Sequence, residues 1–233
     1  MFQKINSSNS VLNSLKNLLV SRWRFLLLVV IGVYSPLQVV AILTIKVLQH
    51  KDGFFWDVPI LMAIHSTASS KLDAIAVVLT KWGSFWTAFP ILSAISLVLL
   101  YKHRWKTFAY VSITAVGNLI INHTAKEIIQ RSRPDLWVSK APEFDYAFPS
   151  GHAMTSMTLV SILLILTWDR PYKWLIVTIG SSYLLVIAWT RLYLGVHFPS
   201  DIFAGWMVAL AWAIGMSLII KPNWHRVTVT HSQ

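Results

Sequence analysis

Six long stretches without Asp, Glu, Lys or Arg constrain the fold of this chain more than any other feature of its sequence. They run from Phe25 to Ile45, Trp82 to Tyr101, Thr107 to Ala125, Ala153 to Trp168, Trp174 to Thr190 and Ile202 to Ile220. Most are long enough to cross about 30 Å of hydrocarbon as a helix, and the shortest does so if the preceding PSGH continues its helix. The sequence therefore predicts an all-α integral membrane bundle of six transmembrane helices.

Buried core helices of a soluble protein are the alternative interpretation of these stretches. Charged residues make up about a quarter of a soluble domain, but only 12% of this chain. Six apolar runs also leave no amphipathic helices to cover a soluble core. The first run follows a polar, basic lead (1–24) and exceeds the roughly 7–15 apolar residues of a signal peptide, so it is predicted to be an uncleaved span. Residues 1–233 are predicted to form one domain.

Basic residues indicate how this bundle is oriented in the membrane. With six spans both termini share one side, which holds eleven of the 20 Lys and Arg residues, against nine on the other side, three of them in motifs described below. The positive-inside rule then places both termini, including the tail 221–233, on the cytoplasmic side of the membrane. We expect this membrane to be a bacterial plasma membrane. Between the first two spans, segment 57–82 is predicted to form one or two interfacial helices, with a simple connecting loop as the alternative.

The overall charge and the absence of cysteine narrow the function further. The net charge of +11 is not gathered into a basic run with interleaved aromatic residues, so no nucleic-acid partner is expected. We attribute the excess to membrane topology and anionic lipid headgroups. The chain has no Cys, which excludes a disulfide framework, a thiol nucleophile and a Cys-ligated metal.

Three short motifs place polar residues on the extracytoplasmic face of the predicted bundle. They are KEIIQRSRPD (126–135), PSGH (149–152) and TRLYLGVHFPSD (190–201). Lys126, Arg133 and Arg191 would converge there, and nothing in the six spans offsets their mutual repulsion. A bound phosphate would offset it, because guanidinium groups match its oxygens and Lys adds a point charge. Snorkelling towards lipid headgroups is the alternative for each cation taken alone.

The PSGH motif complements these cations. Ser150 is a good N-cap, Gly151 lets the backbone approach a ligand closely, and free N–H groups at the helix start favour an anion. His152 stands beside this anion-binding terminus. A plain capped helix start is the alternative.

The GVHFPSD sequence carries the candidate nucleophile. Pro199 suits the first helical turn, which places Asp201 just inside the helix and His197 just before it. A carboxylate four residues away can accept the N–H of one ring nitrogen and leave the other free as a nucleophile. A purely structural His–Asp hydrogen bond is one alternative. A metal site with two His and an Asp is another, but the three cations would repel a divalent ion.

The joint order and spacing of these motifs resemble the signature of the type 2 phosphatidic acid phosphatase superfamily, whose members share a six-span plan. The motifs extend from Lys126 to Asp201. One departure is Thr190, where the family usually has Ser. The resemblance implies that His197 is a nucleophile forming a phosphohistidine, that Asp201 orients it, and that His152 protonates the leaving group and then activates water. The implied phosphate-binding residues are Lys126, Arg133, Arg191, Ser150 and Gly151.

The resemblance implies a lipid phosphate substrate, such as phosphatidate, phosphatidylglycerophosphate or a polyprenyl diphosphate. We expect a reaction without metal or cofactor, because three fixed cations already neutralise the phosphate and no Cys or carboxylate cluster remains for a metal. Phosphotransfer to another lipid would use the same nucleophile and remains an alternative. A lipid transporter is the non-enzymatic alternative, but its pathway would place polar residues through the membrane depth, and here the charges stop at one end. Neither the oligomeric state nor a role for segment 135–146 follows from these motifs.

Overall fold

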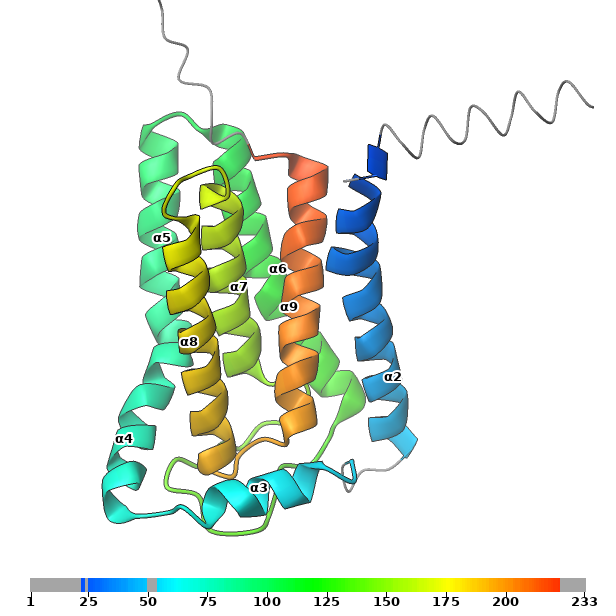
Figure 1. The fold of residues 1–233 in the computed structure, drawn as a ribbon, viewed down its shortest axis with the longest axis vertical. Helices are drawn as coiled ribbons and strands as arrows, with labels where there is room; N and C mark the ends of the chain where they lie inside the picture. The colour runs from blue at the N-terminus through cyan, green and yellow to red at the C-terminus, as the bar shows by residue number, and fades with distance from the viewer. Residues whose placement is uncertain (1–21, 24, 50–53, 223–233) are drawn as a thin grey trace, which may run out of the picture.

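The structure is a computed structural model that describes residues 22–23, 25–49 and 54–222. All regular elements in these ranges are helices, which confirms the predicted all-α class. Most of the predicted polar lead (1–24) and of the tail (221–233) lies outside the described residues. Figure 1 shows the helices packed into an elongated bundle.

A helix coincides with each of the six predicted spans. The first is a continuous helical stretch from Phe25 to Gln49, which contains a π-helical turn, η1 (Val30–Tyr34), followed by α2 (Ser35–Gln49). The others are α5 (Phe85–Tyr101), α6 (Trp105–Ile129), α7 (Gly151–Thr167), α8 (Lys173–Tyr193) and α9 (Pro199–Ile220).

Length and composition make four helical stretches of the described chain suitable to cross a membrane. They are 25–49, 70–101, 173–193 and 199–220, with mean hydropathies between 1.6 and 2.4. The remaining apolar helix, α7, has 17 residues, and α6 has 25 residues. The number of six spans therefore stays a prediction.

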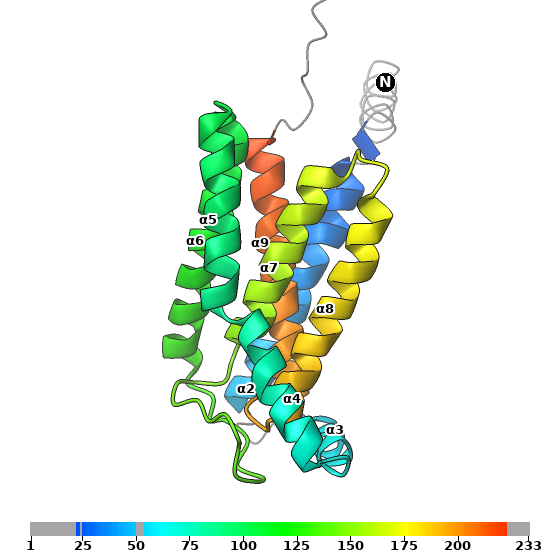
Figure 2. The ribbon, with the colours of Figure 1, turned by 90° about the vertical axis from the view of Figure 1, so that its left-hand side faces the viewer.

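Small residues let the two central helices of the bundle, α7 and α9, approach closely (Figure 2). Ala204, Ala209 and Ala213 on α9 are fully buried. A Cβ atom at Gly205 would lie 2.9 Å from the carbonyl oxygen of Ser150, at the start of α7. This tight packing brings the start of α7 against the start of α9.

Two further helices lie between the first two predicted spans, where one or two were expected and a plain loop was the alternative. These are α3 (Asp57–His65) and α4 (Ser70–Thr80), and the short 3₁₀ turn η2 (Lys81–Gly83) joins α4 to α5. Figure 1 shows α3 lying across one end of the bundle and α4 running obliquely towards α5. Their location in the membrane interface stays a prediction.

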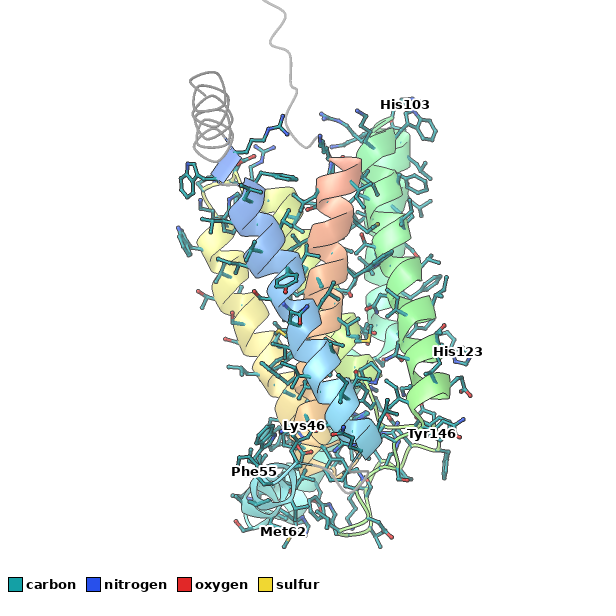
Figure 3. The ribbon with its side chains drawn as sticks, turned by 90° about the vertical axis from the view of Figure 1, so that its right-hand side faces the viewer. Lys46, Phe55, Met62, His103, His123 and Tyr146 are labelled. Atoms are coloured by element: carbon teal, nitrogen blue, oxygen red, sulfur yellow. The ribbon has the colours of Figure 1, made fainter. Side chains whose placement is uncertain are left out.

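The two ends of the bundle carry different structural elements. In Figure 3, Tyr146 and Met62 lie at one end and His103 at the opposite end. The first end carries α3 and the irregular segment 130–150, which joins α6 to α7 (Figure 1). The opposite end carries only the tight turns between neighbouring helices and the described ends of the chain (Figure 1).

Candidate active site

All three sequence motifs meet at the end of the bundle that carries α3. Lys126 lies in the last turn of α6, His152 in the first turn of α7, and Arg191 in the last turn of α8. His197 lies in the turn that connects α8 to α9, and Asp201 in the first turn of α9. Convergence of the motifs on one face was a prediction of the sequence, and the structure places them together.

A left-handed residue ends α6 and turns the chain back across the end of the bundle. Gln130 has φ of 49° and its N–H donates to the Lys126 carbonyl at 3.0 Å, which satisfies a helix-end acceptor. Pro134 follows four residues later and disfavours helical conformation at Arg133. Arg131 and Arg133 therefore lie beyond the helix, where Arg131 contacts Asp201 at the start of α9 and Arg133 contacts His197 in the turn before it.

The start of α7 has the capped geometry that the sequence predicts. The hydroxyl of Ser150 accepts from the Ala153 N–H at 3.5 Å, as an N-cap does. The Ser150 N–H donates to the backbone carbonyl of Asp201 at 3.1 Å and so ties the second motif to the third. A Cβ at Gly151 would lie 3.2 Å from the Asn122 side-chain oxygen, so the backbone is closely approached there.

The turn between α8 and α9 fixes the position of His197. Gly195 has φ of 67°, and a Cβ there would lie 2.6 Å from the Trp137 ring, so both conformation and space require glycine. Pro199 is the first residue of α9, as predicted, and Asp201 accepts the Phe198 N–H at 2.8 Å.

The two ring nitrogens of the fully buried His197 face different partners. Nδ1 lies 3.5 Å from a carboxylate oxygen of Asp201. Nε2 lies 3.1 Å from Nη1 of Arg133. A guanidinium can only donate, so Nε2 presents its lone pair on this side. Burial, together with the positive charges of Arg133 and Arg191, holds the pKa of His197 well below its ordinary value and keeps the ring neutral.

The three predicted cations converge, but two carboxylates accompany them. Glu143 lies 2.8 Å from Nη2 of Arg133 and also pairs with Arg191. Asp145 pairs with Lys126 and Arg133. The repulsion of the cations is therefore partly offset by segment 135–146, which supplies both acids and which the expectation from the six spans left out.

Both carboxylates are ionised at neutral pH. Burial alone would raise the pKa of Glu143, but the positive charges of Arg191 and Arg133 outweigh it, and this pKa lies below its ordinary value. The same effects oppose each other at Asp145. Burial raises its pKa, but the hydrogen bond and the charge of Lys126 lower it by more, so the pKa of Asp145 also lies below its ordinary value.

A second set of ion pairs lies deeper, and the sequence motifs did not indicate it. Arg131 is fully buried, pairs with Asp201, and donates to Asp57 of α3 at 2.9 Å. Ser200 joins the same set, since its hydroxyl donates to Asp57 at 2.6 Å. Arg131 belongs to the RSRP sequence, two residues before Arg133, whereas Asp57 appeared only as the first residue of the predicted interfacial segment 57–82.

The residue that departs from the family pattern makes its side-chain hydrogen bond within its own helix. The Thr190 hydroxyl donates to the Ile187 carbonyl of its own helix at 2.7 Å. A neighbouring threonine takes part instead: Thr80 of α4 accepts a hydrogen bond from Arg191 at 2.7 Å.

A cavity of about 440 Å³ opens beside the cations, between α4, the start of α5, residues 141–143, the start of α7 and the end of α8. Glu143, His152 and Arg191 line its polar side, and Val77 and Trp86 are among its apolar lining. Among the described residues, no group of three or more His, Asp or Glu side chains is arranged to hold a metal ion. The site combines two imidazoles, three cations and an apolar approach, which suits a phosphate attached to a hydrocarbon chain.

Comparison with known proteins points in the same direction. The undecaprenyl-diphosphatase of Sulfolobus acidocaldarius is 25% identical over 77% of this chain and 85% of its own length. The phosphatidylglycerophosphatase B of Bacillus subtilis is 25% identical over 60% of this chain and 70% of its own length.

Two crystal structures share the fold. The transmembrane PAP2-type phosphatidylglycerolphosphate phosphatase from Bacillus subtilis aligns with a TM-score of 0.71 at 23% identity, over 83% of this chain and all of the other. LpxE from Aquifex aeolicus aligns with a TM-score of 0.59 at 22% identity, over 72% of this chain and 97% of the other.

The model of the PAP2 superfamily matches residues 106–225, just over half of the chain, and includes all three motifs. Together with the long apolar helices, this match identifies the chain as an integral membrane protein that belongs to the PAP2 superfamily of lipid phosphatases.

Proposed function

We propose that this protein hydrolyses the terminal phosphate of a membrane lipid through a phosphohistidine at Nε2 of His197. The proposal rests on the different partners of the two ring nitrogens of His197. Nδ1 faces Asp201 at 3.5 Å, and Nε2 faces Arg133 at 3.1 Å, on the side where the cations converge. A neutral imidazole whose Nε2 lone pair points to the cations of the phosphate site is suited to nucleophilic attack.

The reaction proceeds in two displacements. In the first, Nε2 of His197 bonds to phosphorus while the phosphorus–oxygen bond to the lipid breaks, and His152 gives its proton to the departing oxygen. In the second, His152 takes a proton from water, the hydroxide bonds to phosphorus, and the phosphorus–nitrogen bond breaks. Asp201 orients the ring and stabilises the positive charge that the imidazole acquires.

The phosphate oxygens are bound by groups from all three motifs. Lys126, Arg133 and Arg191 neutralise them, and the capped start of α7, with Ser150 and the backbone N–H of Gly151, directs a helix dipole at them. Because fixed cations already stabilise the charge of the transition state, the reaction needs neither a metal ion nor another cofactor.

The substrate class follows from the relatives and from the cavity. Relatives of this chain are named for undecaprenyl diphosphate and phosphatidylglycerophosphate. The cavity beside His152 and Arg191, with Trp86 on its apolar side, offers a lipid chain a route from the bilayer to the cations. We therefore propose a phospholipid phosphate or a polyprenyl diphosphate as substrate.

We also propose a single domain of six spans, with α3 in the membrane interface and the site outside the cytoplasm. The Lys and Arg distribution supports this orientation. Separate single-cysteine variants at Lys140 and Arg104 test it in intact cells, since the chain has no other Cys. An impermeant thiol reagent should label the first and spare the second, and the reverse pattern would place the site in the cytoplasm.

The function is tested by phosphate release from purified protein against a panel of lipid phosphates, with and without chelator. We expect release from at least one of them, unchanged by chelator. Loss of activity in chelator that Mg²⁺ restores would contradict the proposed mechanism. Recovery of the phosphate on a second lipid instead of in water would identify a phosphotransferase.

A further inference from the structure

The carboxylate of Glu143 occupies the centre of the proposed phosphate site. One oxygen lies 2.8 Å from Nη2 of Arg133 and 3.7 Å from Nε2 of His197. The other pairs with Arg191 and lies 3.7 Å from Nδ1 of His152. A single acid therefore faces both histidines and two of the three cations, which is the set of groups assigned to the substrate phosphate.

We propose that Glu143 is an internal competitor for the phosphate site, so that weakly bound monoanionic headgroups are kept out and a phosphate group carrying more negative charge than a carboxylate displaces it. The inference rests on the proposed function, because it takes the substrate phosphate to bind between the same two arginines. Glu143 acts as an internal competitor: it fills the site until a ligand with stronger interactions displaces it.

The charges of the competing groups decide the exchange. A phosphodiester, such as the headgroup of a bulk membrane phospholipid, carries one negative charge and two free oxygens, as the carboxylate does. When a phosphodiester displaces Glu143, the arginines exchange one singly charged anion for another. The phosphodiester also loses translational freedom on binding, which the tethered Glu143 does not lose. A terminal phosphate carries about 1.5 to 2 negative charges and three free oxygens. Only the terminal phosphate therefore gains interactions when it displaces Glu143.

This selection addresses a problem that the bilayer imposes on any such site. Phosphodiester lipids surround the protein, and an open cluster of cations beside a lipid-accessible cavity would bind their headgroups. The apparent dissociation constant of each ligand is its intrinsic value divided by the fraction of sites that are open, so an internal competitor weakens every ligand equally. Its benefit lies in the difference: weak monoanionic ligands are excluded, while terminal phosphates still bind.

The position of Glu143 in the chain permits the displacement. It belongs to the irregular segment 130–150, and its side chain is 26% exposed, so it can leave without unfolding a helix. Asp145, two residues later, holds Lys126 and Arg133 separately. The phosphate therefore replaces one carboxylate, between Arg133 and Arg191, within reach of Nε2 of His197.

Two soluble anions separate the charge effect from the lipid chain: inorganic phosphate and its diester, dimethyl phosphate. Their binding to the purified full-length protein in neutral detergent is measured by titration calorimetry at pH 7.5. We expect wild type to prefer inorganic phosphate by about tenfold or more. Glu143→Gln should bind dimethyl phosphate at least about tenfold more tightly than wild type does, and inorganic phosphate more tightly by a similar factor, because an internal competitor weakens every ligand equally.

Asp135→Asn is the matched control, because it removes the same charge from an exposed position at the start of the same segment. It should leave both affinities within about twofold of wild type. Glu143→Ala provides a second variant if the Gln side chain perturbs the fold, which thermal unfolding reports. Phosphatidylglycerol added to the micelles should inhibit lipid phosphate hydrolysis by the Glu143 variants more strongly than by wild type.

Unchanged affinity for dimethyl phosphate in both folded Glu143 variants would overturn the inference. The proposed function fails in a different measurement, namely when wild type releases phosphate from no lipid in the panel. Because the anion titrations need no turnover, each proposal can fail while the other stands.

Discussion

Two networks of ion pairs meet at His197, and they differ in how far their charges are removed from solvent. The inner network consists of Asp57, Arg131, Ser200 and Asp201. The outer network consists of Lys126, Arg133, Glu143, Asp145 and Arg191. The acids of the inner network have no exposed surface, whereas those of the outer network are 26% and 59% exposed.

This difference indicates that the inner network positions the nucleophile and the outer network binds the substrate. Removing one partner of a buried ion pair leaves an uncompensated charge and typically costs about 3–5 kcal/mol, so the inner network holds one geometry. Acids that remain partly in water lose little when they exchange partners. We infer that the inner network fixes the Nδ1 side of His197 through Asp201, while the outer network binds substrate on the Nε2 side.

The largest expected effect comes from removing the residue where the networks meet. His197→Ala should lower turnover by roughly 10⁴-fold or more, because no other side chain beside Asp201 can form the covalent intermediate. Phosphate release from the best lipid substrate measures this. His123→Ala, an exposed histidine on α6 (Figure 3), is the control and should behave as wild type. Normal turnover by a folded His197→Ala protein would refute the assignment.

The next effect depends on the leaving group of the substrate. His152→Ala should slow hydrolysis of a lipid phosphate by about 10² to 10⁴-fold, because its alkoxide needs a proton. An aryl phosphate needs no proton to depart, so it should still phosphorylate His197 and leave the second step slow. Rapid mixing would then detect a burst of aryl alcohol. Equal losses in the rate of the first step with both substrates would remove His152 from the role of acid.

Arg131 tests whether the inner network positions the nucleophile. Arg131→Lys keeps the charge but cannot reach Asp57 and Asp201 together, so the ring of His197 shifts. We expect kcat to fall by up to about 100-fold with KM nearly unchanged, because the phosphate-binding cations remain. Arg104→Lys is the control, because Arg104 precedes the first residue of α6 and Arg131 follows the last turn of the same helix. A rise in KM without loss of kcat would assign Arg131 to substrate binding instead.

The sequence predicted the parts of this site that local patterns encode. Runs of apolar residues predicted the helices, and proline and serine predicted the starts of α9 and α7, because these signals act within a few residues. Asp57 escaped detection because it lies 74 positions from Arg131 in the chain, and no periodicity links them. Glu143 escaped because it lies in an irregular segment, where nothing in the spacing of residues indicates which way a side chain points.

The smallest expected effect concerns Asp145, the most exposed acid of the two networks. Exposed ion pairs contribute about 0.2–1 kcal/mol, so Asp145→Asn should change substrate affinity by no more than about fivefold. The direction is a lower KM, because Lys126 and Arg133 each lose a competing carboxylate, while kcat stays the same since Nε2 of His197 keeps its surroundings. The difference should shrink with added salt, which screens exposed charges most. If kcat instead fell as far as in Arg131→Lys, Asp145 would act as a positioning residue, and exposure would no longer separate the two networks.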